Sequence, residues 1–180
     1  MPKKLTILVA PVPAVGHMNA CIGLAEVLLS RGHKVVFIVD KSYEGKLVSY
    51  GFEEELLEPS EPLKPNDAQN GETPKNSKPG EEAAGDLLNS GLLSGVSSVE
   101  KLKLMSKMPF WSQLVDKMIA CEPKMKQIVA KHNPDLIIID DFIGSPTLLY
   151  SGKPWVMLFS GNPLFLIDSE NTPPPCSGMV

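Results

Sequence analysis

This sequence has few cysteines, no excess of basic residues and no long hydrophobic run, and each scarcity excludes a class of protein. Its 17 Lys and Arg residues are outnumbered by 21 Asp and Glu residues, and the net charge of -4 argues against nucleic acid as a partner. The three cysteines, Cys21, Cys121 and Cys176, are too far apart to match a metal-binding spacing. We therefore expect free thiols in a reducing compartment, and no metal site.

No apolar run approaches the roughly 20 residues that a membrane-spanning helix needs. The apolar run at residues 5–10 follows two lysines, as the core of a signal peptide would. It is shorter than the roughly 7–15 apolar residues of such a core, and Pro11 ends it. We expect a buried strand there, in a cytoplasmic protein without a membrane span.

Several common motifs are also missing. The dinucleotide fingerprint G-x-G-x-x-G, the phosphate loop G-x-x-x-x-G-K-[ST] and the nucleophile elbow G-x-S-x-G do not occur in the chain. His33 lies in an Arg-Gly-His turn and His132 at the end of an expected helix, so we expect both to be solvated rather than to bind a metal.

Apolar runs alternate with helix-like segments along 180 residues, which is enough chain for one domain with a core. Strands are expected at 5–10, 35–39, 52–57, 135–140 and 155–159, and helices at 19–31, 43–50, 96–108, 112–131 and 145–151. Asn19 is expected to cap the first helix, and Pro123 to interrupt the fourth. Residues 59–80 contain five prolines and few apolar side chains, which predicts a flexible surface loop.

This order of elements predicts an α/β fold. Right-handed crossovers between parallel strands give a Rossmann-like doubly wound sheet with strand order 3-2-1-4-5. Strands 1 and 4 then lie side by side at the point where the order reverses, and ligands bind in such crevices. His17 follows strand 1 and Asp140 ends strand 4, so both side chains can reach one crevice.

A histidine beside a buried carboxylate is a general-base pair, because the carboxylate orients the imidazole and stabilises its protonated form. The alternative is structural: His17 is then a satisfied polar group at a turn, and Asp140 a helix cap. Spacing alone leaves both interpretations open.

Two blocks of sequence resemble the N-terminal portion of the family 1 UDP-glycosyltransferases, which are GT-B enzymes. The first is Pro11-Val12-Pro13-Ala14-Val15-Gly16-His17-Met18-Asn19 with the helix that follows as far as Arg31-Gly32-His33 and Val35. The second runs from Pro134 through Asp140-Asp141-Phe142 to Pro154-Trp155-Val156 and Ser160. The two blocks occur in the order and separation of the family.

The resemblance implies a mechanism. His17 takes the proton of an acceptor hydroxyl, whose oxygen attacks a UDP-sugar with inversion, while Asp140 holds His17. Neither a metal nor another cofactor is required. Asp141 is the alternative partner of His17, but alternation along a strand allows only one of the two acids to face it. Ser160 matches a hydroxyl position that touches the donor sugar.

The resemblance also assigns the acceptor pocket to this portion of the enzyme, and a lipophilic small molecule with a hydroxyl group is the acceptor expected. The candidate contacts near the catalytic pair are Gly16, Met18, Phe142 and Ser160. Further candidates come from the helical insertion: Met105, Met108, Phe110, Trp111 and Met118. The methionines and aromatic residues of the insertion have an alternative role in the hydrophobic core.

Residues 1–180 are accordingly expected to form an incomplete N-terminal acceptor-binding GT-B domain, without the C-terminal domain that binds the donor. Such a fragment is expected to be inactive alone. Two alternatives remain: one chain of a split glycosyltransferase that needs a partner chain for the donor, and a non-catalytic module that binds small molecules. Glucose is the donor sugar commonest in the family, but no residue here selects it.

Overall fold

The computed structural model describes residues 3–60, 85, 88–108, 110–141 and 143–161, and of Phe110 and Trp111 only the backbone. Most of the loop predicted at 59–80 lies outside these residues, as do Phe142 and Cys176.

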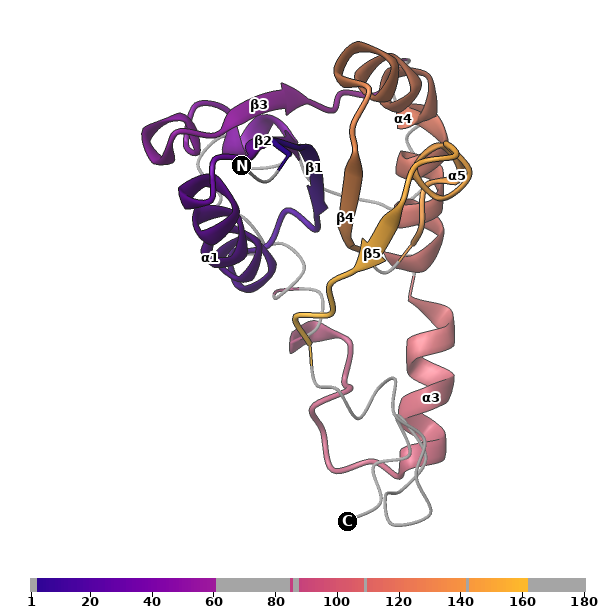
Figure 1. Cartoon of the computed structure of the whole chain (residues 1–180). Coiled ribbons are helices and arrows are strands. Elements are labelled where there is room, and N and C mark those ends of the chain that lie inside the picture. Colours follow the sequence, from indigo (N-terminus) through magenta and orange to yellow (C-terminus); the bar gives the residue numbers. More distant parts are fainter. Residues whose placement is uncertain (1–2, 61–84, 86–87, 109, 142, 162–180) are drawn as a thin grey trace, which may run out of the picture.

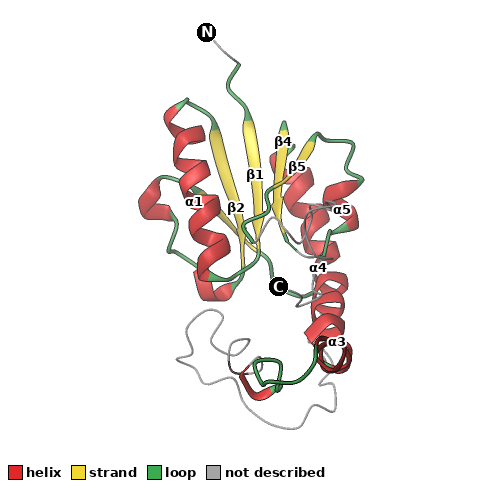
Figure 2. Cartoon of the chain, turned by 90° about the horizontal axis from the view of Figure 1, so that it is seen from below, coloured by secondary structure: helices red, strands yellow, loops and turns green. Residues whose placement is uncertain are grey.

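A parallel five-stranded sheet forms the centre of the described chain (Figure 2). Its order, β3-β2-β1-β4-β5, is the order predicted from the sequence. The strands are β1 (Thr6–Pro11), β2 (Lys34–Val39), β3 (Glu53–Leu56), β4 (Leu136–Asp140) and β5 (Trp155–Met157). The long central runs of Val, Ile and Leu are typical of strands that are covered on both faces.

Helices cover the two faces of the sheet, with α1 on one side and α4 on the other (Figures 1 and 2). The helices are α1 (Val15–Ser30), α3 (Ser98–Lys107), α4 (Phe110–His132) and α5 (Pro146–Leu149). Cys21 and Ala25 of α1 pack on Val9 and Phe37, whereas Met125 of α4 belongs to the core on the opposite face. The fold is therefore a three-layer α/β sandwich around the sheet.

The first helix begins earlier than the sequence predicts. Its N-cap is Ala14 rather than Asn19, and no side chain caps it. The ring of Pro13 disfavours helical structure in the residues before it, so the helix cannot begin earlier. It begins shortly after Pro13, at Val15. His17 consequently lies in the first turn of α1 rather than on the preceding loop.

The segment predicted as one helix at 43–50 forms two short 3₁₀ helices instead, η1 (Lys41–Tyr43) and η2 (Val48–Tyr50). Asp40 caps the first by accepting a hydrogen bond from the Ser42 amide. Gly51 ends the second with a φ of 88°, a conformation that glycine adopts without a steric penalty.

The expected break at Pro123 does not occur, because α4 continues through it. Proline removes one hydrogen bond from a helix interior. Met125 and Ile128, within the two turns that follow, are buried against the sheet and hold the helix in place.

The predictions for the other two histidines need correction. The side chain of His132 is only 5% exposed, and its Nε2 lies 2.6 Å from Glu55 Oε1. Nδ1 of His33 accepts a hydrogen bond of 3.2 Å from the Leu5 amide, so this side chain is half-buried rather than solvated. Both are held by polar contacts that tie the ends of strands and helices together. No helix in the described part of the chain is long and apolar enough to span a membrane.

Candidate active site

His17 and Asp140 meet at the carboxyl edge of the sheet. His17 lies in the first turn of α1, and Asp140 is the last residue of β4, the strand beside β1. Nδ1 of His17 is 3.1 Å from Oδ1 of Asp140; the histidine side chain is 19% exposed and the carboxylate 2%. The predicted contact between the two side chains is confirmed, and their catalytic role stays a prediction.

Strand register and alternation place Asp140 under α1. Asp140 pairs with Pro11, and its carbonyl accepts a hydrogen bond of 2.8 Å from the Val12 amide. Ile138, two residues earlier, packs in the core beneath α1, so Asp140 projects from the same face. Asp141 instead accepts a hydrogen bond from the Ile143 amide and lines a pocket on the opposite face.

Ser160 joins the pair in one network. Its Oγ lies 2.8 Å from His17 Nδ1 and 2.8 Å from Asp140 Oδ2. The hydroxyl has one proton, and when that proton is donated to the carboxylate an oxygen lone pair is left to face Nδ1. With Asp140 ionised, the three contacts are satisfied together only when Nδ1 carries a proton. The geometry therefore favours the tautomer that has its lone pair on Nε2.

Cys21 is a fourth member that the sequence analysis did not assign to the site. It lies one helical turn after His17, and its thiol donates a weak hydrogen bond of 3.8 Å to Asp140 Oδ2. Burial, together with the neighbouring Asp140 carboxylate, raises the pKa of the Cys21 thiol to about 12. The spacing of four residues from His17 is a signal that was present in the sequence, because such residues share a helix face.

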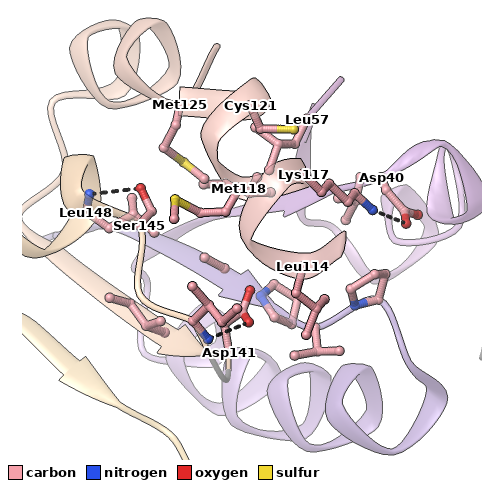
Figure 3. Close-up of a pocket in the computed structure, with 18 of the residues that line it drawn as sticks. Asp40, Leu57, Leu114, Lys117, Met118, Cys121, Met125, Asp141, Ser145 and Leu148 are labelled. Carbon is pink, nitrogen blue, oxygen red and sulfur yellow. Dashed lines mark hydrogen bonds and ion pairs between the residues drawn. The ribbon is translucent and has the colours of Figure 1, made fainter. Parts of the chain in front are cut away.

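A mostly apolar pocket lies between α4 and the carboxyl ends of β1, β2 and β4 (Figure 3). Its cavity volume is about 130 Å³, slightly below the ~150 Å³ of a cavity known to hold one benzene ring. The strand ends contribute Ala10, Ile38 and Ile139, and α4 contributes Leu114, Met118, Cys121 and Met125. The turn from Pro11 to Pro13, which leads to His17, forms another part of the wall.

The predicted binding residues are distributed unevenly around this pocket. Met18 lines it, although it is also part of the core beneath α1. Gly16 lies in the first turn of α1, with open space where a Cβ would stand. Met108 follows the end of α3 and is not among the residues that line the cavity. The side chains of Trp111 and Phe142 lie outside the described residues, so their contacts stay predictions.

Polar groups of the pocket are mostly engaged with one another. Lys117 Nζ lies 3.6 Å from Asp40 Oδ2 at the mouth of the cavity. Glu122 accepts hydrogen bonds from the hydroxyl groups of Ser145 and Thr147 at the start of α5. Among the described residues, no group of three or more His, Cys, Asp or Glu side chains is placed to hold a metal ion.

Comparison with known proteins identifies the fold. No protein-family model and no curated protein matches the sequence. Among solved structures, CalG4, the calicheamicin glycosyltransferase, matches 95% of this chain with a TM-score of 0.54 and 18% sequence identity. The fold is the Rossmann-like α/β fold of GT-B glycosyltransferases.

Two further matches have TM-scores below 0.5. SsfS6, a glycosyltransferase of Streptomyces sp. SF2575, matches 85% of the chain at 14% identity with a TM-score of 0.49. Arabidopsis thaliana UGT89C1, solved with UDP-L-rhamnose, matches 77% at 19% identity with a TM-score of 0.41. The chain spans 33%, 38% and 30% of the lengths of CalG4, SsfS6 and UGT89C1.

Proposed function

We propose that this chain is the acceptor-binding portion of an inverting UDP-sugar-dependent glycosyltransferase, with His17 as its general base. The observation that carries the proposal is the contact between His17 Nδ1 and the buried carboxylate of Asp140 at the crevice beside β1. A carboxylate on Nδ1 orients the imidazole and stabilises the imidazolium that forms when Nε2 accepts a proton. The glycosyltransferase fold supports the same conclusion.

In the proposed reaction, Nε2 of His17 removes the proton of an acceptor hydroxyl. The oxygen attacks the anomeric carbon of the sugar as the bond to UDP breaks, and UDP leaves with the bonding electrons. Attack from the face opposite the leaving group inverts the anomeric configuration. Asp140 stays ionised throughout and balances the charge of the imidazolium.

The acceptor is proposed to be a lipophilic molecule with a hydroxyl group, and the pocket favours an aromatic one. Sulfur atoms of Met18, Met118, Cys121 and Met125 lie among its apolar walls. Thioether sulfur makes favourable contacts with aromatic rings, and methionine adapts to ligands of different shape. A cavity of about 130 Å³ takes one ring, so larger acceptors would extend toward its open side.

The donor is proposed to bind to a part that this chain does not supply, since the chain covers 33% of the length of CalG4. That part belongs either to the same polypeptide or to a partner chain. Isothermal titration with UDP-glucose and with a panel of hydroxylated aromatic compounds tests this division. Binding of the aromatic compounds without UDP-glucose supports it. Binding of UDP-glucose by this chain alone contradicts it.

Replacing His17 tests its role as the base. In an enzyme that includes a donor-binding part, we expect His17→Ala to lower kcat by about 10²–10⁴-fold, the usual contribution of a general base. Acceptor affinity should change little, because His17 does not line the apolar pocket. His33→Gln is the matched control. Unchanged turnover in His17→Ala would remove His17 from the mechanism. Acceptor binding without any turnover, even with a donor-binding part present, would instead favour a non-catalytic binding module.

Filling the cavity tests the assignment of the pocket to the acceptor. Met118→Trp places a larger side chain in a cavity of about 130 Å³, so we expect the affinity for aromatic acceptors to fall by tenfold or more, about 1.4 kcal/mol. Ile119→Trp is the control, because Ile119 is 59% exposed on the same helix. Titration calorimetry of both variants measures the difference. Equal affinity in both would place the acceptor elsewhere.

A further inference from the structure

Three side chains surround the carboxylate of Asp140, although a histidine–carboxylate pair needs only one. His17 Nδ1 contacts Oδ1, whereas Ser160 Oγ and Cys21 Sγ both contact Oδ2. Asp140 is 2% exposed, and a carboxylate buried to this extent stays ionised only when hydrogen bonds replace its water. The two oxygens therefore have separate sets of donors, and only Oδ1 faces the imidazole.

Ser160 reaches the site through the chain that follows β5. The Leu158 amide donates a hydrogen bond of 2.8 Å to the Ile139 carbonyl, which continues the pairing of β5 with β4. Leu158 packs against the core beneath α1, and alternation along an extended chain places Ser160 on the same face. The segment that follows β5 thus presents a hydroxyl to the site, and the end of β4 presents the carboxylate.

We propose that Ser160 and Cys21 are positioning residues, which hold Oδ2 of Asp140 and thereby keep the proton of His17 on Nδ1. The purpose of this arrangement rests on the proposed function, because only a base needs its lone pair on Nε2. Ser160 has the larger effect, since its hydroxyl lies 2.8 Å from both partners, whereas the thiol is a weak donor at 3.8 Å.

Ser160 contacts both His17 and Asp140, whereas the hydrogen bond of the Cys21 thiol is to the Asp140 carboxylate. Because the pKa of its thiol is raised to about 12, Cys21 remains a protonated donor at neutral pH and adds no second negative charge next to Asp140. Its position one turn from His17 means that the helix supplying the imidazole also anchors the carboxylate.

The tautomer of His17 is the measurement that tests this inference, and it requires neither donor nor turnover. Long-range ¹H–¹⁵N spectra of the chain distinguish a protonated from an unprotonated ring nitrogen, and loss of signals in His17→Gln identifies the resonances. At neutral pH we expect Nδ1 to be protonated and Nε2 unprotonated in neutral His17. A predominant Nε2–H form in the unmodified chain would overturn the inference without the need for any variant.

Substitutions then separate the two positioning residues. Ser160→Ala should lower the ratio of Nδ1–H to Nε2–H by about tenfold, the effect of one hydrogen bond, and Ser160→Thr should preserve it. Cys21→Ala should lower the ratio less, whereas Cys21→Ser should not lower it. An unchanged ratio in a folded Ser160→Ala variant would overturn the inference. If the tautomer behaves as expected but His17→Ala keeps its turnover, the proposed function fails and this inference stands.

Discussion

A carboxylate that is 2% exposed must find its hydrogen-bond donors inside the protein, and the side chain of Asp140 finds them on α1 and in the segment after β5. The neighbouring Asp141 lies on the other face of the sheet. Its carboxylate accepts a hydrogen bond from the Ile143 amide there, and Asp141 lines the apolar pocket. At the residue scale, two identical and adjacent side chains therefore have different surroundings, and they should respond differently to the same substitution.

Asp140→Asn is expected to reduce kcat/KM by several orders of magnitude, on the order of 10⁴ when an amide replaces the carboxylate behind a catalytic histidine. The side-chain amide of asparagine has an NH₂ group, a hydrogen-bond donor, in place of one carboxylate oxygen that accepts hydrogen bonds in Asp140. Asp141→Asn should reduce kcat/KM less than tenfold, about 1.4 kcal/mol. Steady-state kinetics in the presence of a donor-binding part measure kcat/KM of both variants. Circular dichroism checks that both variants are folded. Equal losses would contradict the assignment of the dyad to Asp140.

At the scale of elements, α1 and the turn after η2 pack together through one glycine. Gly51 has a φ of 88°, and a Cβ added there would lie 3.2 Å from Cδ2 of Leu29 in α1. Gly23, in contrast, lies within α1 on its exposed side, and a Cβ added there would meet nothing within 4 Å. The backbone of Gly51 is left-handed, whereas that of Gly23 is helical.

Alanine at these two glycines should change stability in opposite directions. Gly51→Ala is expected to lower the free energy of unfolding by about 1–2 kcal/mol, because the left-handed conformation is unfavourable for residues with a Cβ. Gly23→Ala is expected to raise it by about 0.5–1 kcal/mol through helix propensity. Urea denaturation of both variants measures the changes. Destabilisation by Gly23→Ala would mean that α1 needs the absence of a side chain there.

At the scale of the whole molecule, Glu55 connects the sheet to the helical layer around α4. It lies on β3 and accepts hydrogen bonds from Lys131 and His132 at the end of α4. Burial opposes its ionisation, yet these two hydrogen bonds hold the pKa of Glu55 below its ordinary value of 4.5. The contact joins the edge strand of the sheet to Lys131 at the end of α4, 76 residues after Glu55 in the chain.

The Glu55 contact predicts a pH dependence of folding. A carboxyl group with a lowered pKa in the folded state stabilises the protein fully above its unfolded pKa, and the contribution disappears as the pH falls through the folded pKa. Glu55→Gln should therefore be less stable than the unmodified chain by about 1–2 kcal/mol at pH 7. The difference should shrink as the pH falls below 4.5. Urea denaturation across this range measures it, with the exposed Glu58→Gln as control. A constant difference would contradict the prediction.

The amino-acid sequence by itself determined the sheet and the place of the site. Continuous apolar runs at β1, β2 and β4 indicate strands buried on both faces, and the alternation of strands and helices predicts the observed order of the parallel sheet. From that order, His17 and Asp140 are expected to reach one crevice, because β1 and β4 are neighbours and their carboxyl ends lie at one edge, and the structure brings the two side chains into contact.

Only the tertiary structure decided which further groups reach Asp140 and where the pocket lies. The family resemblance predicts that Ser160 touches the donor sugar. Its hydrogen bonds to His17 and Asp140 depend instead on the path of the chain after β5. The sequence predicts a solvated His132 at a helix end, whereas in the structure Glu55 of β3 lies against its side chain. Hydrophobic periodicity records which side of an element is buried, whereas the partner of a polar side chain depends on which distant segment packs beside it.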